Sequence, residues 1–243
     1  MLELYQFPFS HYCEKARWSL DYKGQSYRVV NLLPGFHASV TRKIAPGSCV
    51  PIIRNGKEVV QDSAAIIDWL DARVPERLLT PAEATLAEAA REWERWAGKE
   101  LGDTLRLWFY HYTLAERDKA LGFLLTDASW FKKPLFRMAF SKVGPLMRRF
   151  MRIDDASAAE AFGRLQHGLD RLDAAVSARP YLAGDAFSRA DLSAAALLSP
   201  MLARGKSAAE VAAMFPAPVL RWREEAVQRP SLQWVARLYQ QHR

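Results

Sequence analysis

The spacing of hydrophobic and polar positions changes from strand-like to helical about one third of the way along the chain. Residues 2–5 alternate as a half-buried strand does, and residues 14–20 carry helix formers with no breaker before Gly24. Residues 27–30 then predict a second strand, so the chain should open with a β-α-β unit whose strands are parallel. Residues 37–43 predict a short, irregular helix.

A β-hairpin is the clearest local pattern that follows. Asn55-Gly56 separates two apolar runs, residues 51–54 and 57–60, and this dipeptide predicts a tight turn with positive φ at both of its residues. Residues 64–70 predict a helix directly after the hairpin. Together these elements form a predicted α/β unit.

From residue 82 onward the apolar spacing is helical and no strand pattern remains. The stretches with this spacing are 82–112, 158–176, 184–198 and 217–239. The first should bury one stripe, made of Leu86, Ala89, Ala90, Trp93, Trp96 and Ala97. The predicted domains are therefore an α/β domain over 1–75, a linker over 76–81 and an all-α domain over 82–243.

One helix start in the second half has a specific signal. Ser188 is placed as an N-cap with Asp191 at the third helical position, which predicts a capping box. Phe187 and Leu192 occupy the positions of a hydrophobic staple. The helix that follows is apolar enough to be central to the core.

The composition is that of an ordinary globular protein, but the charge is unevenly placed. The chain has 243 residues and a net charge of +7. Residues 128–152 contain no acidic residue and seven basic ones, which are Lys132, Lys133, Arg137, Lys142, Arg148, Arg149 and Arg152. This segment alone accounts for the whole excess, so the basic character is regional and does not indicate a nucleic-acid-binding protein.

The basic segment has two interpretations. One is one or two amphipathic helices with a solvated basic face, and Pro134 and Pro145 argue against a single long helix lying on a membrane surface. The other is a surface for an anionic membrane or an acidic partner.

The remaining sequence features favour a cytoplasmic protein without a metal. The start of the chain lacks a secretory pattern, and no uncharged apolar run approaches the ~18 residues of a membrane helix. Cys13 and Cys49 cannot form a disulfide framework, and their spacing with the histidines fits no zinc motif.

Ser10 lies where the first strand meets the first helix. Unpaired backbone N–H groups and the helix dipole favour negative charge at such a position. From the local sequence alone, Ser10 is either a simple helix cap or part of an anion site.

Three short motifs and one capping box follow one another along the chain: Ser10-x-x-Cys13, Val50-Pro51, Asp62-Ser63 and the box at Ser188 and Asp191. In this order they resemble the glutathione transferase superfamily over nearly the whole chain, and the first motif is similar to the serine-type theta and delta classes. The resemblance implies a thioredoxin-like α/β N-terminal domain, an all-α C-terminal domain, a homodimer and glutathione as co-substrate.

The resemblance also implies a role for each motif residue. Ser10 would donate a hydrogen bond to the glutathione sulfur and favour the thiolate. Val50 would pair through its backbone with the cysteinyl part of glutathione, and Pro51 would be a cis-proline. Asp62 and Ser63 would bind the amine and carboxylate of the γ-glutamyl group.

Two positions depart from the family pattern. Members often carry a basic residue before Val-Pro that meets the glycyl carboxylate, and here that residue is Cys49. His37, with Arg42 and Lys43 behind it, is the predicted substitute, although His37 could equally be an exposed loop residue. Asp62 replaces the commoner Glu and is one methylene shorter.

The predicted activity is conjugation of glutathione to a small hydrophobic electrophile, as in detoxification. The candidates for the electrophile pocket are Phe9, Trp108, Phe109, Tyr110 and Tyr112. Two alternatives stay open at this point. One is a catalytically weak binding or scaffold protein that uses the basic segment, and the other is a glutathione-dependent thiol reductase acting through Cys13. A Cys at the fourth position of such a motif is turned into the helix, which favours a small buried residue instead.

Overall fold

The computed structural model describes residues 1–128 and 130–243. The first part of the chain forms a four-stranded sheet and three helices. In chain order these are β1 (Leu2–Gln6), α1 (His11–Tyr22), β2 (Tyr27–Asn31), α2 (Ala38–Thr41), β3 (Ile52–Asn55), β4 (Glu58–Gln61) and α3 (Ser63–Arg73). The strand order is β2-β1-β3-β4, with β1 parallel to β2 and antiparallel to β3.

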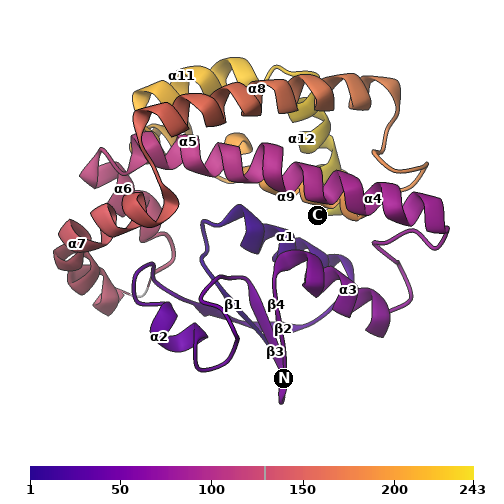
Figure 1. Cartoon of the computed structure of the whole chain (residues 1–243), viewed down its shortest axis with the longest axis horizontal. Helices are drawn as coiled ribbons and strands as arrows, with labels where there is room; N and C mark the ends of the chain where they lie inside the picture. The colour runs from indigo at the N-terminus through magenta and orange to yellow at the C-terminus, as the bar shows by residue number, and fades with distance from the viewer. Residues whose placement is uncertain (129) are drawn as a thin grey trace.

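The sheet is covered on one side by α1 and α3, which lie between it and the helices of the second part (Figure 1). β1 is buried along its whole length, because it is an inner strand and both of its faces are covered. The helix α2 lies on the other side of the sheet (Figure 1).

The hairpin forms where the sequence predicts it, but its turn is shifted by one residue. Asn55 pairs with Glu58, so the two turn residues are Gly56 and Lys57, and Asn55 ends the strand β3. Only Gly56 has a positive φ, at 63°. A glycine with positive φ at the first turn position already matches the twist of the strands, so Asn55 need not leave the strand.

The second part of the chain is helical. Its elements are α4 (Ala84–Ala97), the π-helical turn η1 (Gly98–Gly102), α5 (Asp103–Thr113), α6 (Arg117–Leu124), the 3₁₀ turn η2 (Trp130–Lys132), α7 (Lys133–Met151), α8 (Asp155–Ala178), α9 (Arg189–Leu202), α10 (Ala208–Met214), α11 (Ala217–Ala226) and α12 (Pro230–His242). The predicted fold class, a thioredoxin-like domain followed by an all-α domain, is confirmed.

The helix α9 is the centre of this part. It contacts α1, α4 and α12, and eleven of its residues are buried. Its predicted capping box is present: the Asp191 carboxylate accepts from the Ser188 backbone N–H at 2.9 Å, and Ser188 Oγ accepts from the Ala190 N–H at 3.3 Å. Asp191 is fully buried, and this burial raises its pKa to about 6.

The predicted apolar stripe of α4 is only partly correct. Leu86 is exposed, and the buried line of the helix runs through Ala90, Glu94 and Ala97. Glu94 is buried because it accepts from Arg189 at 2.6 Å and Lys15 at 2.6 Å, which join α4 to α9 and α1. Periodicity of apolar residues cannot reveal a buried ion pair of this kind.

Two further stretches are helical, as the sequence predicts. The stretch 217–239 forms two helices, α11 and α12, and Pro230 is the first residue of α12. The basic segment forms a single helix, α7, which includes both of its prolines. Pro134 lies in the first turn, where its missing N–H is no loss, and Pro145 is accommodated within the helix. In the part of the chain that the structure describes, no helix has the length and apolar character to cross a membrane.

Candidate functional site

Ser10 is the N-cap of α1. Its backbone is extended, and its Oγ accepts from the Cys13 backbone N–H at 3.4 Å. The chain reaches this position through a turn in which the Ser10 N–H donates to the Phe7 carbonyl at 3.1 Å. Capping uses only a lone pair of the hydroxyl oxygen, so the hydroxyl proton remains available to an anion at the helix start.

A first pocket brings together the residues of the second and third motifs. We call it the Asp62 pocket; it encloses about 630 Å³ and is lined by Tyr12, Cys49, Val50, Pro51, Gln61, Asp62, Ser63 and Arg106. The Val50–Pro51 peptide bond is cis, and the Pro51 carbonyl accepts from the Asp62 N–H at 3.2 Å. The structure thus places Val50, Pro51, Asp62 and Ser63 around one space.

Asp62 is itself a helix cap. One oxygen of its carboxylate, Oδ1, accepts from the N–H groups of Ala64 and Ala65 at 2.7 and 3.2 Å, at the start of α3. Its φ of 94° is uncommon for a residue other than glycine. Among the described residues the second carboxylate oxygen has no such partner, so it is available to a cationic group in the Asp62 pocket.

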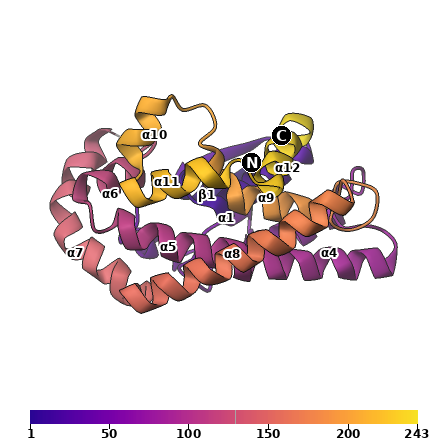
Figure 2. The same ribbon diagram turned by 90° about the horizontal axis from the view of Figure 1, so that it is seen from above.

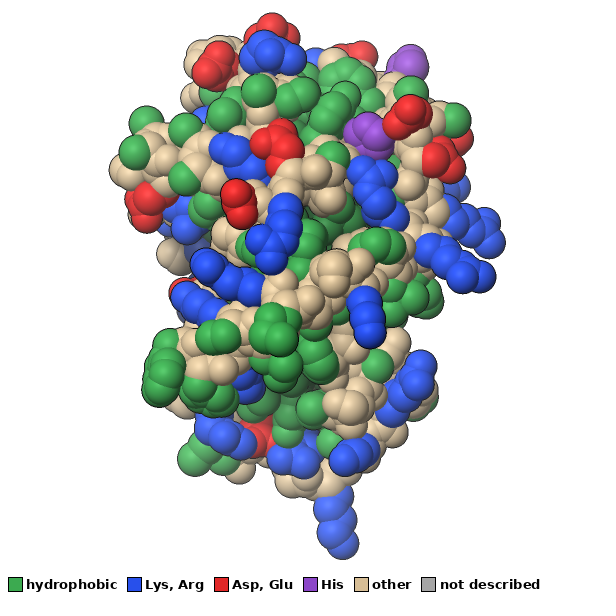
Figure 3. All heavy atoms as spheres, turned by 90° about the vertical axis from the view of Figure 1, so that its left-hand side faces the viewer, with side chains coloured by type: hydrophobic (Ala, Val, Ile, Leu, Met, Phe, Trp, Pro, Cys, Tyr) green, Lys and Arg blue, Asp and Glu red, His purple; other side chains and the backbone are tan. Residues whose placement is uncertain are grey.

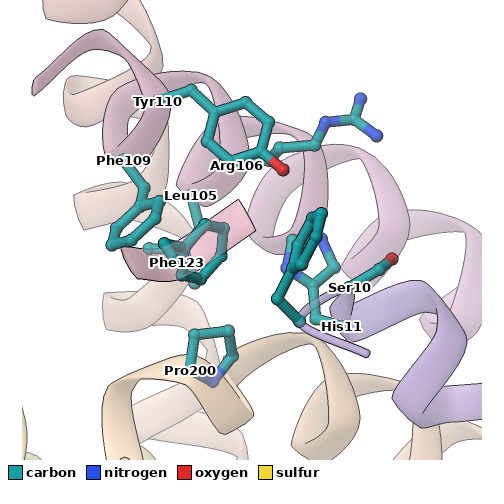
Figure 4. Close-up of a pocket in the computed structure, with 9 residues that line it drawn as sticks. Ser10, His11, Leu105, Arg106, Phe109, Tyr110, Phe123 and Pro200 are labelled. Atoms are coloured by element: carbon teal, nitrogen blue, oxygen red, sulfur yellow. The ribbon is translucent and has the colours of Figure 1, made fainter. Parts of the chain in front are cut away.

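A second pocket lies beside Ser10 (Figure 4). We call it the Ser10 pocket; it is small, and the space between its lining atoms, including the part open to solvent, is about 360 Å³. Its residues are Phe9, Ser10, His11, Leu105, Arg106, Phe109, Tyr110, Phe123 and Pro200. Figure 4 shows Phe109 and Phe123 at one side and Arg106 with Ser10 at the other. The pocket is therefore apolar at one end and polar at the end nearest Ser10.

Of the predicted pocket aromatics, Phe9, Phe109 and Tyr110 line the Ser10 pocket, whereas Trp108 and Tyr112 do not. The Trp108 ring packs 5.0 Å from Phe162 and 4.9 Å from Trp222, and Tyr112 packs against Trp108. The prediction for Trp108 and Tyr112 is wrong because of helical phase: one face of α5 lines the pocket, and these two residues point into the helical core.

Arg106 was not expected from the sequence, although it is common to both pockets. Its guanidinium pairs with Asp103 at 2.8 Å and lies 5.6 Å from the ring centre of Tyr12. Its Nε is buried without a partner among the described residues. Arg106 stands on the same face of α5 as Phe109 and Tyr110, but only the tertiary structure shows that this face turns toward Ser10.

Tyr12 holds the two domains together at this point. Its hydroxyl donates to the Gly98 carbonyl at 2.9 Å and lies 3.0 Å from an Asp103 carboxylate oxygen. A Cβ atom on Gly102 would lie 2.7 Å from the Tyr12 hydroxyl, so the π-helical turn η1 needs glycine there. Such π-turns often occur beside functional sites.

His11 is the second residue that the sequence did not single out. It lines the Ser10 pocket, is buried, and its Nε2 has no partner among the described residues. Burial, helped by the positive charge of Arg106, lowers the pKa of His11 to about 3. The imidazole is therefore neutral at physiological pH.

The lowered pKa of His11 predicts that the folded protein loses stability in acid. Its folded pKa lies below the ordinary value of about 6.5, so the unfolded chain binds a proton that the folded chain does not. The contribution of neutral His11 to the free energy of unfolding is fully present above about pH 6.5, and it is lost as the pH drops from there toward 3. In this window the free energy of unfolding should fall by up to about 1.4 kcal/mol for each pH unit. His11→Leu should abolish this contribution to the slope. Urea unfolding at several pH values measures the slope. His167→Leu, on an exposed helix face, is the control and should leave the slope unchanged; an unaltered slope in His11→Leu contradicts the prediction.

His37 does not join the other motif residues. It lines a different groove beneath α7, and its ring packs edge-on against Phe7 at 5.0 Å. Burial lowers the pKa of His37, which weakens it as a carboxylate ligand. Arg42 and Lys43 are exposed. The structure therefore does not support the predicted role of His37 toward the glycyl carboxylate.

The two cysteines lie in contrasting places. Cys49 is exposed, whereas Cys13 is fully buried in the first turns of α1. Burial raises the pKa of the Cys13 thiol, which suppresses the reactive thiolate. This environment agrees with Cys13 as a small buried residue.

Comparison with known proteins gives two family matches. Residues 4–78 match the glutathione S-transferase N-terminal domain, and residues 136–230 match the glutathione S-transferase C-terminal domain. The glutathione S-transferase TCHQD of Arabidopsis thaliana is 26% identical over 215 residues, which is 84% of this chain and 76% of that protein. A zeta-class glutathione S-transferase of Euphorbia esula is 35% identical over 85 residues, covering 34% of this chain and 38% of that one.

Solved structures show the same fold. The beta-etherase LigF of a Sphingobium species superposes with a TM-score of 0.65 at 21% identity, covering 97% of this chain and 98% of that one. A glutathione S-transferase of Methylobacterium radiotolerans, in complex with glutathione sulfonate, has a TM-score of 0.60 at 18% identity and covers 96% of this chain and 92% of that one. The two glutathione S-transferase domain models together match more than half of the chain, one in each domain, and the chain belongs to the glutathione S-transferase superfamily.

Proposed function

We propose that this protein is a serine-type glutathione transferase that joins the glutathione thiolate to a small hydrophobic electrophile. One observation carries the proposal: Arg106 lines both the Asp62 pocket and the Ser10 pocket, so the two pockets adjoin each other at this side chain. A glutathione tripeptide bound in the Asp62 pocket would place its cysteinyl sulfur in the Ser10 pocket.

The proposed binding mode assigns each end of glutathione to a group of matching charge. The free carboxylate oxygen of Asp62 meets the γ-glutamyl amine, and Ser63, at the start of α3, meets the carboxylate. The backbone of Val50 pairs with the cysteinyl unit, as in strand addition. Arg106 supplies positive charge where the two pockets meet.

The thiolate is the reactive species. A free thiol has a pKa of about 8.5, and lowering it by ~2 units requires about 2.7 kcal/mol. A charge-assisted hydrogen bond from the Ser10 hydroxyl supplies about 1.5–3 kcal/mol, and the N-terminus of α1 adds about 0.3–1 kcal/mol. These contributions are together sufficient. The sulfur then attacks the electrophilic carbon, an S–C bond forms, and the leaving group departs with its electron pair.

The shape of the Ser10 pocket indicates what kind of electrophile fits. Phe9, Phe109 and Phe123 form an apolar wall suited to an aromatic ring. The Tyr110 hydroxyl is directed toward the polar side of the pocket in Figure 4, and burial raises its pKa, so it stays a hydrogen-bond donor. We therefore favour an aromatic electrophile that carries an oxygen acceptor.

Two measurements test the proposed function together. The purified protein should be retained on immobilised glutathione and should turn over a generic aryl halide. A folded protein that does not bind glutathione at millimolar concentration would contradict the proposal and favour the scaffold alternative. Activity lost in Cys13→Ala but kept in Ser10→Ala would instead favour the reductase alternative.

The homodimer and the cytoplasmic location are further parts of the proposal. Light scattering of the purified protein should give twice the chain mass of 27.6 kDa.

Asp62→Asn should weaken glutathione binding without unfolding the protein. Asparagine retains the cap of α3 but loses the negative charge, so we expect the Kd for glutathione to rise about tenfold. Isothermal titration calorimetry measures the change. Glu83→Gln is the matched control, because Glu83 is also an acidic cap, accepting from two N–H groups at the start of α4, outside both pockets. Equal affinities for Asp62→Asn and the unmodified protein would contradict the binding mode.

A further inference from the structure

Exposed hydrophobic side chains gather on one face of the molecule. Among the described residues, twelve large hydrophobic side chains are exposed. Six of them lie on η2 and α7, namely Trp130, Phe131, Leu135, Met138, Leu146 and Phe150. Trp130 is 83% exposed and Phe150 is 81% exposed, so neither side chain has cover within the chain. We call the outward side of η2 and α7 the α7 face.

Helical phase explains how α7 can be apolar on two sides. Its inner side buries Phe136, Phe140 and Val143 against the core. Met138 stands on the opposite side, whereas Leu135 and Leu146 stand on one flank between the two sides, and all three side chains are exposed. The sequence predicts a solvated basic face for this segment. The structure adds that exposed apolar side chains lie on the same outer side as the basic ones.

The charge on the α7 face has one sign. None of the seven basic residues between 128 and 152 forms an ion pair with an acidic side chain within the described chain, although eighteen such pairs occur elsewhere. Lys142 and Arg149 stand on the same outward side of the helix as Met138. Figure 3 shows green and blue side chains mixed across the middle of this end of the molecule, with the red acidic ones mostly toward the top.

A groove extends the apolar surface from α7 onto α2. It is lined by Leu135, Lys132 and Phe136 from the α7 side and by Phe36 and Val40, both exposed, from the α2 side. It encloses about 630 Å³. Two segments distant in sequence therefore contribute to one apolar surface with a lysine at its edge.

We propose that the α7 face docks onto an anionic lipid bilayer, with the axis of α7 parallel to the membrane plane. Exposed Trp, Phe and Leu side chains enter the headgroup boundary, and lysine and arginine side chains beside them meet lipid phosphates. A second copy of the chain is a poorer occupant, because a symmetric contact would place each unpaired basic face against the other. The lack of any acidic residue in the segment matches a surface that is negative throughout.

Vesicle flotation with the full-length protein tests the proposal. We expect binding to vesicles of phosphatidylcholine with about one third phosphatidylglycerol, little binding to pure phosphatidylcholine, and release at high salt. Replacing Lys132, Lys142 and Arg149 with serine should lower the partition coefficient roughly hundredfold. The charge-matched control replaces three exposed arginines elsewhere, Arg179, Arg221 and Arg237, and should bind as the unmodified protein does.

A second variant tests the apolar contribution. Trp130→Ser, Phe131→Ser, Leu146→Ser and Phe150→Ser together should abolish flotation, whereas Val29→Ser with Leu86→Ser, two exposed residues elsewhere, should not. All side chains changed are exposed, and thermal melting verifies that each variant folds. The proposal is overturned if the unmodified protein stays unbound, if it binds both lipid mixtures equally, or if the basic and apolar variants bind normally. Loss of self-association in the apolar variant, without any vesicle binding, would assign the face to a second copy instead.

Discussion

Replacing Ser10 with alanine is expected to reduce kcat/KM for aryl halide conjugation about 10- to 100-fold near pH 6.5. The variant loses a charge-assisted hydrogen bond worth about 1.5–3 kcal/mol to the thiolate. The defect should shrink as the pH rises past about 8.5, because the glutathione thiol then ionises without help. Steady-state rates measured from pH 6 to 9 give both the size of the defect and its pH dependence.

The control for this prediction must separate catalysis from helix capping, since Ser10 does both. Asp154→Ala removes a comparable side-chain cap, at the start of α8, away from every pocket that Ser10 lines, and should leave kcat/KM unchanged. Ser10→Thr keeps a hydroxyl and should recover part of the activity. Full activity of Ser10→Ala at pH 6.5 would show that another group supports the thiolate.

The second large effect concerns stability and lies where the two domains meet. Glu94→Ala is expected to lower the free energy of unfolding by about 3–5 kcal/mol, because it leaves the buried Lys15 without its carboxylate and removes one of the two carboxylates that pair with the buried Arg189. Urea unfolding measures the change. Glu88→Ala on the same helix is the matched control: Glu88 pairs with Arg95 at the surface and should cost at most about 1 kcal/mol. A loss below about 1 kcal/mol in Glu94→Ala would contradict a structural role for this cluster.

The remaining contacts of Arg189 explain why its side chain is fixed. It also donates to Asp68 of α3 at 2.6 Å and to the Thr80 hydroxyl at 3.0 Å, in the segment that joins the domains. The cluster therefore connects α1, α3, α4 and α9. Loss of Glu94 should disturb the packing of α1, and through it the position of Ser10.

Most of the fold follows from local sequence patterns because these patterns report short-range physics. The strand at residues 2–5 and the helix that starts at Ser188 and Asp191 form as predicted, but β1 is buried along its whole length and not half-buried. The shifted turn at Gly56 shows the limit of such patterns, since strand pairing decided which two residues form the turn. The limits of the domains and linker, 1–75, 76–81 and 82–243, stay a prediction.

The candidate site was predictable only where motifs in the first domain converge. Val50, Asp62 and Ser63 meet in one pocket, as their order along the chain suggests. Arg106 and His11 were missed because their importance depends on which face of a helix the tertiary structure turns toward Ser10. The burial of Lys15 and Arg189 was equally invisible, since a buried charge is recognised only with its partner.

Direct titration of enzyme-bound glutathione tests the central claim, that Ser10 stabilises the thiolate. Ultraviolet absorbance of the thiolate, followed from pH 5 to 10 with saturating glutathione, gives the pKa of the bound thiol. We predict a value about 2 units below the free thiol's 8.5 for the unmodified protein, and a return toward 8.5 in Ser10→Ala. A bound thiol that titrates near 8.5 in the unmodified protein, or at the same low pH with and without the Ser10 hydroxyl, would contradict the proposed mechanism.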